Sequence, residues 1–161
     1  MRTLSPEHPH HNHKHCVRDG IAAAEAYCQS QGLRLTEIRK HVLELIWADH
    51  RPVGAYAILE RLTQEGHAPA PPTVYRALEF LTDNGLVHRI ESRNAFIACA
   101  HPGEAGHVPA FFLCSSCDNA IEIEDPSLNR ALKRDAEQLQ FQPSHHTLEI
   151  AGVCSDCLTS K

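Results

Sequence analysis

The sequence predicts an α+β protein in which a helical N-terminal part ends in a β-hairpin and a small α/β part follows. Two observations predict this order. Apolar residues recur at helical spacing in the first half of the chain and give way to short strand-like runs after residue 85. Two Cys-x-x-Cys pairs, Cys114–Cys117 and Cys154–Cys157, then frame the last third. A length of 161 residues suits one compact domain or two small ones.

The amino-acid composition excludes several classes of protein. Hydrophobic residues make up 42% of the chain and charged residues 22%, which excludes a disordered or repetitive polymer. No apolar run approaches the roughly 20 residues of a membrane helix, and no signal peptide opens the chain. We therefore expect a soluble, cytoplasmic protein with no membrane partner. The seven cysteines, an odd number, favour metal ligation over a disulfide framework.

The net charge of −5 lies in the last third of the chain. Residues 94–161 carry four Lys or Arg against nine Asp or Glu, whereas residues 34–93 carry eight of each. Nucleic-acid-binding domains are often strongly basic, so this balance weighs mildly against DNA binding. It does not exclude DNA binding, because phosphate contacts depend on the local placement of Arg and Lys.

The first fifteen residues, MRTLSPEHPHHNHKH, hold five histidines and two prolines with almost nothing apolar. Such a segment cannot bury a core, so residues 1–15 are expected to form a disordered, solvated tail. A loose zinc-gathering tract and an expression tag are the alternative interpretations.

Four helices are expected before the hairpin. Thr36 is the expected N-cap of the second helix, and Gly32, Gly66 and Gly85 follow the ends of the other three. The expected helices cover residues 19–31, 37–50, 54–65 and 71–84.

The fourth helix separates an apolar face from a polar one. Its buried stripe at i, i+3, i+4 and i+7 consists of Val74, Ala77, Leu78 and Leu81. At the helical repeat, Arg76 lies roughly 150° from the centre of this stripe. Tyr75 and Glu79 also lie off it.

Residues 86–90 and 95–99 are expected to form two short strands around a loop at 91–94. Helices followed at once by a hairpin are the order of a winged helix-turn-helix, in which the last helix enters the major groove of DNA. A small helical bundle packed on a hairpin, with Arg76 merely solvated, fits the same order. The order of elements alone leaves both interpretations open.

From Pro109 onward the pattern becomes α/β. Two strands are joined through the first cysteine pair, Asp125-Pro126 caps a helix, and residues 146–153 form a last strand. The expected helix carries Leu128, Leu132 and Leu139. A unit this small is marginal alone, so we expect a metal and a second copy of the chain to complete it.

The paired cysteines predict a zinc site. Four thiolates match the tetrahedral preference of zinc, and a site closed by four cysteines leaves no position for a substrate, so its role should be structural. A redox function for the two pairs is the alternative. Neither pair is expected to open a helix after a buried strand, where a thioredoxin-like thiol gains its low pKa, and this disfavours the redox interpretation.

A second, mixed set of ligands is suited to zinc. His88 should face Ile97 across the hairpin, with Cys99 two residues further along the same face. Glu122 is expected to point outward between two isoleucines, and His107 lies in a loop. Taken singly, each of these residues is more often structural. The candidate set is His88, Cys99, His107 and Glu122, with His101, His145 and His146 as rival ligands.

Four segments together resemble the ferric uptake regulator family, and within it the zinc uptake regulators. The resemblance covers roughly residues 20–158. It implies a dimeric, metal-dependent DNA-binding repressor with an N-terminal winged helix and a C-terminal dimerisation domain that holds structural zinc. The segments that carry it are LRLTEIRKHVLELI, APPTVYRALEFLTDNGLVHRIES, FFLCSSC and CSDC. The corresponding domains are a tail (1–15), a winged helix (16–100), a hinge loop (101–108) and a dimerisation domain (109–161).

The resemblance also implies roles for single residues, with two zinc sites per subunit. Cys114, Cys117, Cys154 and Cys157 match the structural site of the family. The mixed set His88, Cys99, His107 and Glu122 matches the regulatory site of zinc-sensing members. The residues expected to meet DNA are Tyr56, Thr73, Tyr75, Arg76 and Arg39. Iron and peroxide sensors carry a His-His-Asp-His-like cluster before the first cysteine pair; here that stretch reads VPAFFLC, which favours zinc over iron.

The expected function is therefore a zinc-responsive repressor that binds double-stranded operator DNA as a homodimer and controls zinc uptake. A sensor of another metal and a zinc-stabilised interaction module without a DNA role are the alternatives. An enzyme with a small organic substrate is not expected, because no His-x-Glu deaminase motif occurs and no oxyanion hole or third group accompanies Cys99 and His88.

Overall fold

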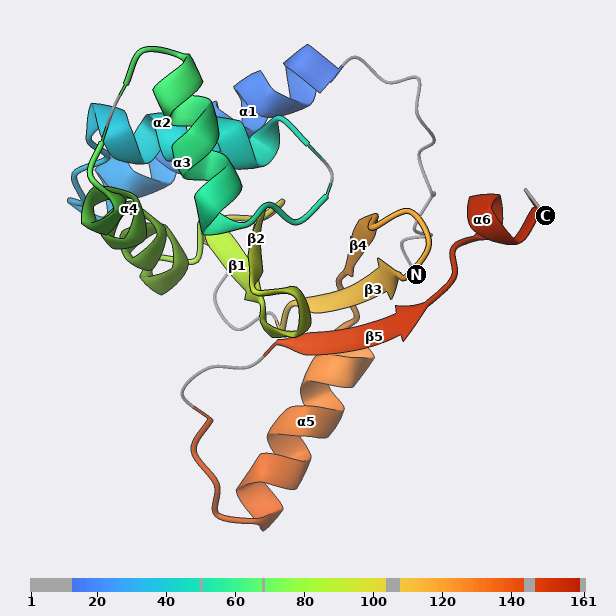
Figure 1. Cartoon of the computed structure of the whole chain (residues 1–161). Coiled ribbons are helices and arrows are strands. Elements are labelled where there is room, and N and C mark those ends of the chain that lie inside the picture. Colours follow the sequence, from blue (N-terminus) through green and yellow to red (C-terminus); the bar gives the residue numbers. More distant parts are fainter. Residues whose placement is uncertain (1–12, 50, 68, 104–107, 144–146, 160–161) are drawn as a thin grey trace. The chain divides into compact units, whose positions relative to one another are not determined.

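The computed structural model describes residues 13–49, 51–67, 69–103, 108–143 and 147–159. The chain forms two compact units, Met1–Gly103 and Glu104–Lys161, each with its own helices and sheet (Figure 1). The predicted fold class, a helical part with a hairpin followed by a small α/β part, is confirmed. The finer domain boundaries given above stay predictions.

The first unit contains the four expected helices. The first begins at His13, earlier than residue 19, so the prediction that residues 13–15 belong to a disordered tail is wrong. Residues 13–18 contain neither Pro nor Gly, and nothing in their sequence stops a helix. Residues 1–12 lie outside the described part. The helices are α1 (His13–Ser30), α2 (Glu37–Trp47), α3 (Ala55–Gln64) and α4 (Pro71–Asp83).

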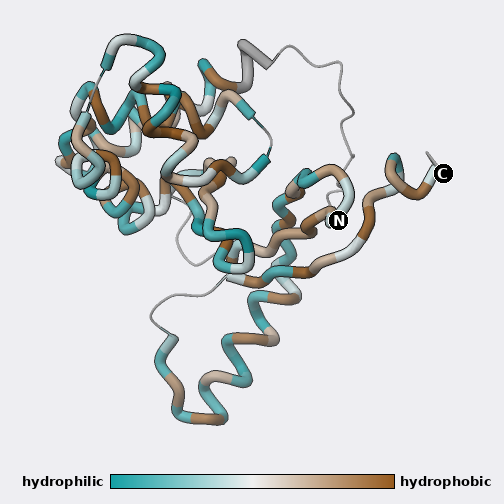
Figure 2. Tube along the Cα trace, in the orientation of Figure 1, coloured by the Kyte–Doolittle hydropathy of each residue, from teal (hydrophilic) through white to brown (hydrophobic). Residues whose placement is uncertain are grey.

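The core of the first unit lies where α4 packs on α2. The predicted stripe of α4 is confirmed: Val74, Ala77, Leu78 and Leu81 are all at most 2% exposed. They belong to one cluster with Val42, Leu43 and Ile46 of α2. Figure 2 shows the same alternation of hydrophobic and hydrophilic residues along the helices of this unit.

The turn between α3 and α4 has a defined hydrogen-bonding pattern. Gly66 adopts φ +85°, its N–H donates to the carbonyl of Thr63 at 3.1 Å, and the N–H of His67 donates to Leu62 at 2.8 Å. This pair of bonds is a Schellman motif, which satisfies the last carbonyls of a helix and needs a residue that tolerates positive φ. The turn therefore ends α3 sharply and directs the chain into Pro71, the first residue of α4.

The hairpin follows α4 after a few residues. It consists of β1 (Val87–Ile90), the 3-10 turn η1 (Glu91–Arg93) and β2 (Ala95–Ala98). His88 lies opposite Ile97, as predicted. Val53, before α3, pairs with Phe96 through hydrogen bonds of 2.8 and 2.9 Å, which joins the hairpin to the helical part.

The described residues of the second unit form a three-stranded sheet with one long helix and one short one. Its sheet has the order β4-β3-β5, with β4 antiparallel and β5 parallel to β3. As predicted, Asp125 caps the long helix by accepting a 2.7 Å hydrogen bond from the N–H of Ser127. The elements are β3 (Ala110–Cys114), β4 (Ala120–Ile123), α5 (Pro126–Gln138), β5 (Leu148–Gly152) and α6 (Ser155–Thr159).

Among the residues that the structure describes, no helix has the length and apolar character needed to cross a membrane.

Replacing Gly103 by Ala tests how the chain beyond the hairpin is anchored. Gly103 has φ +87°, and a Cβ atom there would lie 2.5 Å from the ring of Tyr27 on α1. We expect Gly103→Ala to lower the free energy of unfolding in urea by about 2–4 kcal/mol, from positive φ and overpacking together. Gly32→Ala is the matched control, because Gly32 has φ +65° but no atom within 4 Å of its would-be Cβ. It should cost only about 1–2 kcal/mol. Equal losses in the two variants would contradict the contact with Tyr27.

Candidate metal centres and nucleic-acid face

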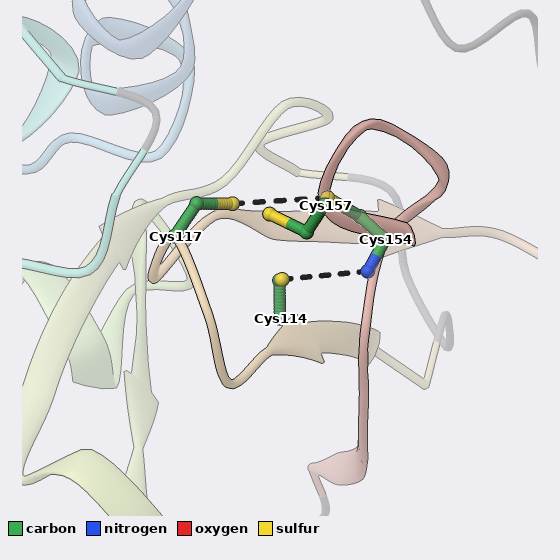
Figure 3. A group of neighbouring side chains, drawn as sticks. All are labelled: Cys114, Cys117, Cys154 and Cys157. Carbon is green, nitrogen blue, oxygen red and sulfur yellow. Dashed lines mark hydrogen bonds between the residues drawn. The ribbon is translucent and has the colours of Figure 1, made fainter. Parts of the chain in front are cut away.

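The two Cys-x-x-Cys pairs converge in the second unit. Cys114 ends β3, Cys117 lies in the following turn, Cys154 follows β5 and Cys157 lies in α6. Their four sulfur atoms lie within 4.8 Å of one another, and none of the four cysteines forms a disulfide (Figure 3). The Sγ atoms of Cys117 and Cys154 are 3.7 Å apart. Sulfur ligands about 2.3 Å from a zinc ion lie about 3.8 Å apart in a tetrahedron, so this spacing fits zinc.

Backbone N–H groups point at the sulfur of Cys114, the most buried of the four. Cys154 donates to it at 3.3 Å and Ser116 at 3.4 Å. These donors, that of Cys154 first, favour the thiolate and lower the pKa of Cys114 to about 6. The turn that supplies the Ser116 donor is closed by Asp118, which adopts φ +61°, a conformation that Asp tolerates better than most residues.

The pKa of Cys157 is shifted in the opposite direction, because neighbouring thiols hydrogen-bond with it. Hydrogen bonding with the thiols of Cys154 and Cys117 raises the pKa of Cys157 to about 12. The cluster thus accepts one negative charge readily and resists further charge when no cation is present. A divalent cation would remove this penalty, because it stabilises thiolates directly.

The second cysteine pair opens a helix, because α6 begins directly after Cys154 and follows β5. That strand is half-buried to exposed, so the prediction that neither pair opens a helix after a buried strand is confirmed for the described residues. The four sulfurs also gather at one point instead of forming two separate pairs, and both observations disfavour a redox function.

The hairpin brings two candidate ligands together within the first unit. His88, on β1, is 9% exposed, and Cys99, directly after β2, is 1% exposed. The N–H of Cys99 donates to Leu86 at 3.0 Å, which extends the hairpin pairing by one residue. The ligand atoms of His88 and Cys99 lie within 4.8 Å of each other. A thiol and an imidazole at this separation can bind the same ion.

The remaining members of the mixed set belong to other parts of the chain. Glu122 is on β4 and pairs with Phe111, which is fully buried, whereas Ile121 pairs with the exposed Phe112. The expectation that Glu122 points outward is therefore wrong: it shares the covered face of the sheet. Strand alternation alone does not tell which of two faces is covered. His107, His145 and His146 lie outside the described residues, and His101 is exposed in a turn.

The candidate DNA-contacting residues lie mainly on exposed surface of α3 and α4. Tyr56, in the first turn of α3, is 78% exposed, and Tyr75 on α4 is 48% exposed. Thr73 and Arg76 are exposed on α4 as well. Within the described ranges Arg76 forms no ion pair, so its guanidinium is available to an external acceptor.

Arg39 differs from the other four candidates. Its guanidinium carbon lies 3.6 Å from the ring centroid of Phe80 on α4, and its Nη1 donates to the carbonyl of Arg34 at 2.7 Å. A cation held over an aromatic face in this way is a stabilising contact. Arg39 therefore ties α2 to α4.

The sequence analysis did not predict the groups that position Arg39 and the sulfur of Cys114. The ring of Phe80 and the backbone donors of Ser116 and Cys154 carry no motif of their own. Asp118 carried a weak signal, since an Asp-Asn pair after a cysteine knuckle is typical of a turn with positive φ.

Zinc loading of the four-cysteine site should release a pH-dependent number of protons. Because the pKa of Cys114 is lowered to about 6, its thiolate is already present at pH 7 in the metal-free protein. We expect about three protons per bound zinc at pH 7.5, rising toward four near pH 5.5. Calorimetric titrations in buffers of different ionisation enthalpy measure this number, and Cys99→Ser keeps the hairpin ligands from contributing. A proton count that stays constant over this range would contradict the lowered pKa.

Comparison with known proteins agrees with this arrangement. The model of the Ferric uptake regulator family matches residues 30–151. The Zinc uptake regulation protein of Escherichia coli (strain K12) is 32% identical over 145 residues, which cover 90% of this chain and 85% of that protein. The crystal structure of holo XcZur is 46% identical with a TM-score of 0.80, covering 88% of this chain and 98% of that one. A zinc uptake regulator complexed with zinc and DNA is 31% identical with a TM-score of 0.83, covering 89% and 96%. The chain belongs to the ferric uptake regulator family, as its sequence predicted, and within that family it is similar to the zinc uptake regulators.

Proposed function

We propose that this protein is a zinc-responsive transcriptional repressor that binds operator DNA as a homodimer and controls genes of zinc uptake. The observation that carries the proposal is the His88–Cys99 pair, which places two zinc-type ligands on the hairpin that directly follows α4. The similar regulator that was solved with zinc and DNA supports both the metal and the nucleic acid.

The structural site of the proposal is the four-cysteine cluster. Cys114 and Cys117 would hold the end of β3, while Cys154 and Cys157 would hold the end of β5 and the start of α6. Because β3 and β5 are parallel neighbours in the sheet, a zinc ion there would cross-link their carboxyl ends. Structural zinc in small domains contributes on the order of 10 kcal/mol, enough to decide whether this unit folds.

The regulatory site would use His88, Cys99, His107 and Glu122. Two of these residues belong to the hairpin, one to the connecting segment and one to the sheet of the second unit. When bound, a zinc ion would supply a four-ligand bridge between the two units. The residues of this bridge would select one orientation of the winged helix out of several, which is how ligand binding shifts a population.

The size of the switch follows from linkage. Typical couplings between two binding sites are about 1–3 kcal/mol, whereas a near-complete switch needs roughly 5 kcal/mol. Two regulatory sites in a dimer can add toward this value. Operator DNA must then tighten zinc binding by the same factor by which zinc tightens DNA binding.

Tyr56, Thr73, Tyr75 and Arg76 would meet the operator. In a winged helix-turn-helix the second helix of the motif enters the major groove, and a guanidinium there can bond two acceptors of a guanine. Arg39, held over Phe80, is better suited to keep α4 in position than to contact bases.

A homodimer would present two such helices to a twofold operator. An exposed apolar row crosses the sheet of the second unit: Phe112 pairs with Ile121 on one side and with Ile150 on the other. All three are at least 40% exposed. The helix α5 contains no buried residue among those described. A second copy of the chain would cover these surfaces, in line with the rule that contiguous exposed apolar patches mark interaction sites.

The two rival functions are a sensor of iron or manganese and a zinc-stabilised module without a DNA role. A sensor of iron or manganese would use harder ligands, whereas the buried thiol of Cys99 favours zinc. A zinc-stabilised module without a DNA role would leave the exposed face of α4 unexplained. We do not propose an enzyme: a zinc ion held by four cysteines would have no open position, and the sequence identifies no oxyanion hole or third group beside Cys99 and His88.

The direct test is a mobility-shift assay against duplexes selected from genomic DNA, with zinc, iron or manganese buffered at defined free concentrations, together with metal analysis of the protein. The proposal expects retardation with zinc at the lowest free concentration and loss of it with a chelator. Retardation that needs iron or manganese instead would identify a different sensor. No metal-dependent retardation with any of the three would reject the regulatory function.

Variants of the two candidate centres should fail in different ways. We expect Cys99→Ser and Glu122→Gln to leave folding and dimerisation intact and to remove zinc-dependent DNA binding, because the bridge loses a ligand. Cys114→Ser should instead unfold the second unit, because its sulfur carries the structural site. Circular dichroism, sedimentation and the shift assay separate the two outcomes. If all three variants behave alike, the division into structural and regulatory sites is wrong.

Arg76 gives a test of base recognition. Arg76→Ala should weaken binding to the preferred duplex by about 1–3 kcal/mol and relax base preference at one position of each half-site. Arg76→Lys is the matched control, since lysine keeps the charge but not the planar pair of donors. It should retain the salt dependence of wild type while losing most of the discrimination. Unchanged base preference in both variants would remove Arg76 from the recognition surface.

A further inference from the structure

A side-chain contact outside both metal centres joins α2 to the turn before α4. The Nε2 atom of His41, on α2, contacts the Oε2 atom of Glu65, 24 residues further along the chain. The side chains are 25% and 45% exposed, so the contact is partly shielded from water. The ring of His67 meets that of His41 edge-on, with ring centroids 4.8 Å apart.

Glu65 lies at the end of α3, so its contact with His41 restrains the segment that leads into α4. Glu65 is the C-cap of α3, and its N–H donates to the carbonyl of Arg61 at 3.0 Å. Gly66 and His67 complete the Schellman turn, after which α4 begins at Pro71. A bond from α2 to this C-cap therefore restrains the turn that leads into α4.

The charges around His41 are mainly acidic. Glu37 and Glu44 lie one helical turn before and after it on α2. Lys40 is engaged with Glu25 of α1 at 2.6 Å. From α3 and the following turn come Glu65 and His67, and Arg61 lies one turn before Glu65. An added proton on His41 would thus be met by carboxylates on its own helix and by Glu65 at the end of α3.

We propose that His41, acting through Glu65, is a positioning residue for α4, and that its protonation strengthens operator binding. The inference rests on the proposed function, because operator DNA is its final readout. Imidazole side chains change charge between pH 5 and 8, and an imidazolium–carboxylate bond is stronger than a neutral one. The restraint on the turn is therefore tighter at the acidic end of this range.

The predicted pH dependence runs opposite to that of metal binding. Protons compete with zinc for imidazole and thiolate ligands, so acid weakens any zinc-dependent step. The contact between His41 and Glu65 strengthens in acid instead. Comparing wild type with His41→Gln at saturating zinc separates the two effects, because the substitution leaves every proposed metal ligand in place.

The test combines a DNA-free measurement with a DNA-binding one. The first is a double-mutant cycle of His41→Gln, Glu65→Gln and the double variant, read as urea unfolding of the zinc-loaded protein at pH 6.5 and 8.5. The second is anisotropy of the zinc-loaded protein with a duplex selected by wild type. Glu60→Gln is the matched control, since Glu60 is an exposed acid on the same helix that contacts Gln64 instead of His41.

We expect coupling between His41 and Glu65 at pH 6.5 that shrinks at pH 8.5. Wild type should bind the duplex about two- to fivefold more tightly than His41→Gln at pH 6.5, the range of a partly exposed ion pair, and nearly equally at pH 8.5. Glu60→Gln should follow wild type at both values. Parallel pH profiles for wild type and His41→Gln, or coupling that does not depend on pH, would overturn the inference. A coupling with the expected pH dependence, in a protein that retards no duplex, would reject the proposed function and with it the link to DNA.

Discussion

The burial of one stripe of α4 is the constraint on which the first unit depends. Each fully buried aliphatic side chain contributes about 1.5–3 kcal/mol, so the stripe from Val74 to Leu81 outweighs any single polar contact of the helix. Turning α4 to bury Arg76 would expose this stripe and desolvate a charge at once. The core therefore decides the outward face of the helix. The exposed side chains at positions 73, 75 and 76 follow from packing on the opposite side.

The second unit has less buried apolar surface than the first. Its long helix has no buried residue among those described, and its sheet leaves an apolar row exposed. A unit of this size buries a small share of its surface and is marginally stable for that reason. In the proposed regulator, a zinc ion on the four sulfurs would cross-link the ends of β3 and β5, and the backbone donors to Cys114 already favour its thiolate. A partner copy would supply the remaining burial.

In the proposed regulator, the hairpin connects the metal ligands to α4, the helix that would contact DNA. β1 begins shortly after α4 ends, and Leu86 between them is buried. His88 and Cys99 thus lie on an element whose position is tied to α4 by packed side chains and a short connection. Val53 and Arg39 add contacts from the loop before α3 and from α2. A displacement at these ligands is transmitted through a packed body, because closely packed interiors do not absorb strain locally.

The order of the elements, the stripe of α4, the register of the hairpin and the grouping of the cysteines could all be predicted from the sequence. These features depend on local periodicity and spacing, which short stretches of sequence record. The sequence did not determine where α1 begins, that α6 follows Cys154, or which face of β4 is covered, because those depend on what packs from elsewhere in the chain. Only the tertiary structure placed Arg39 over Phe80 and His41 against Glu65. Both contacts join residues more than twenty positions apart, and no repeat or motif within either segment specifies such a partner.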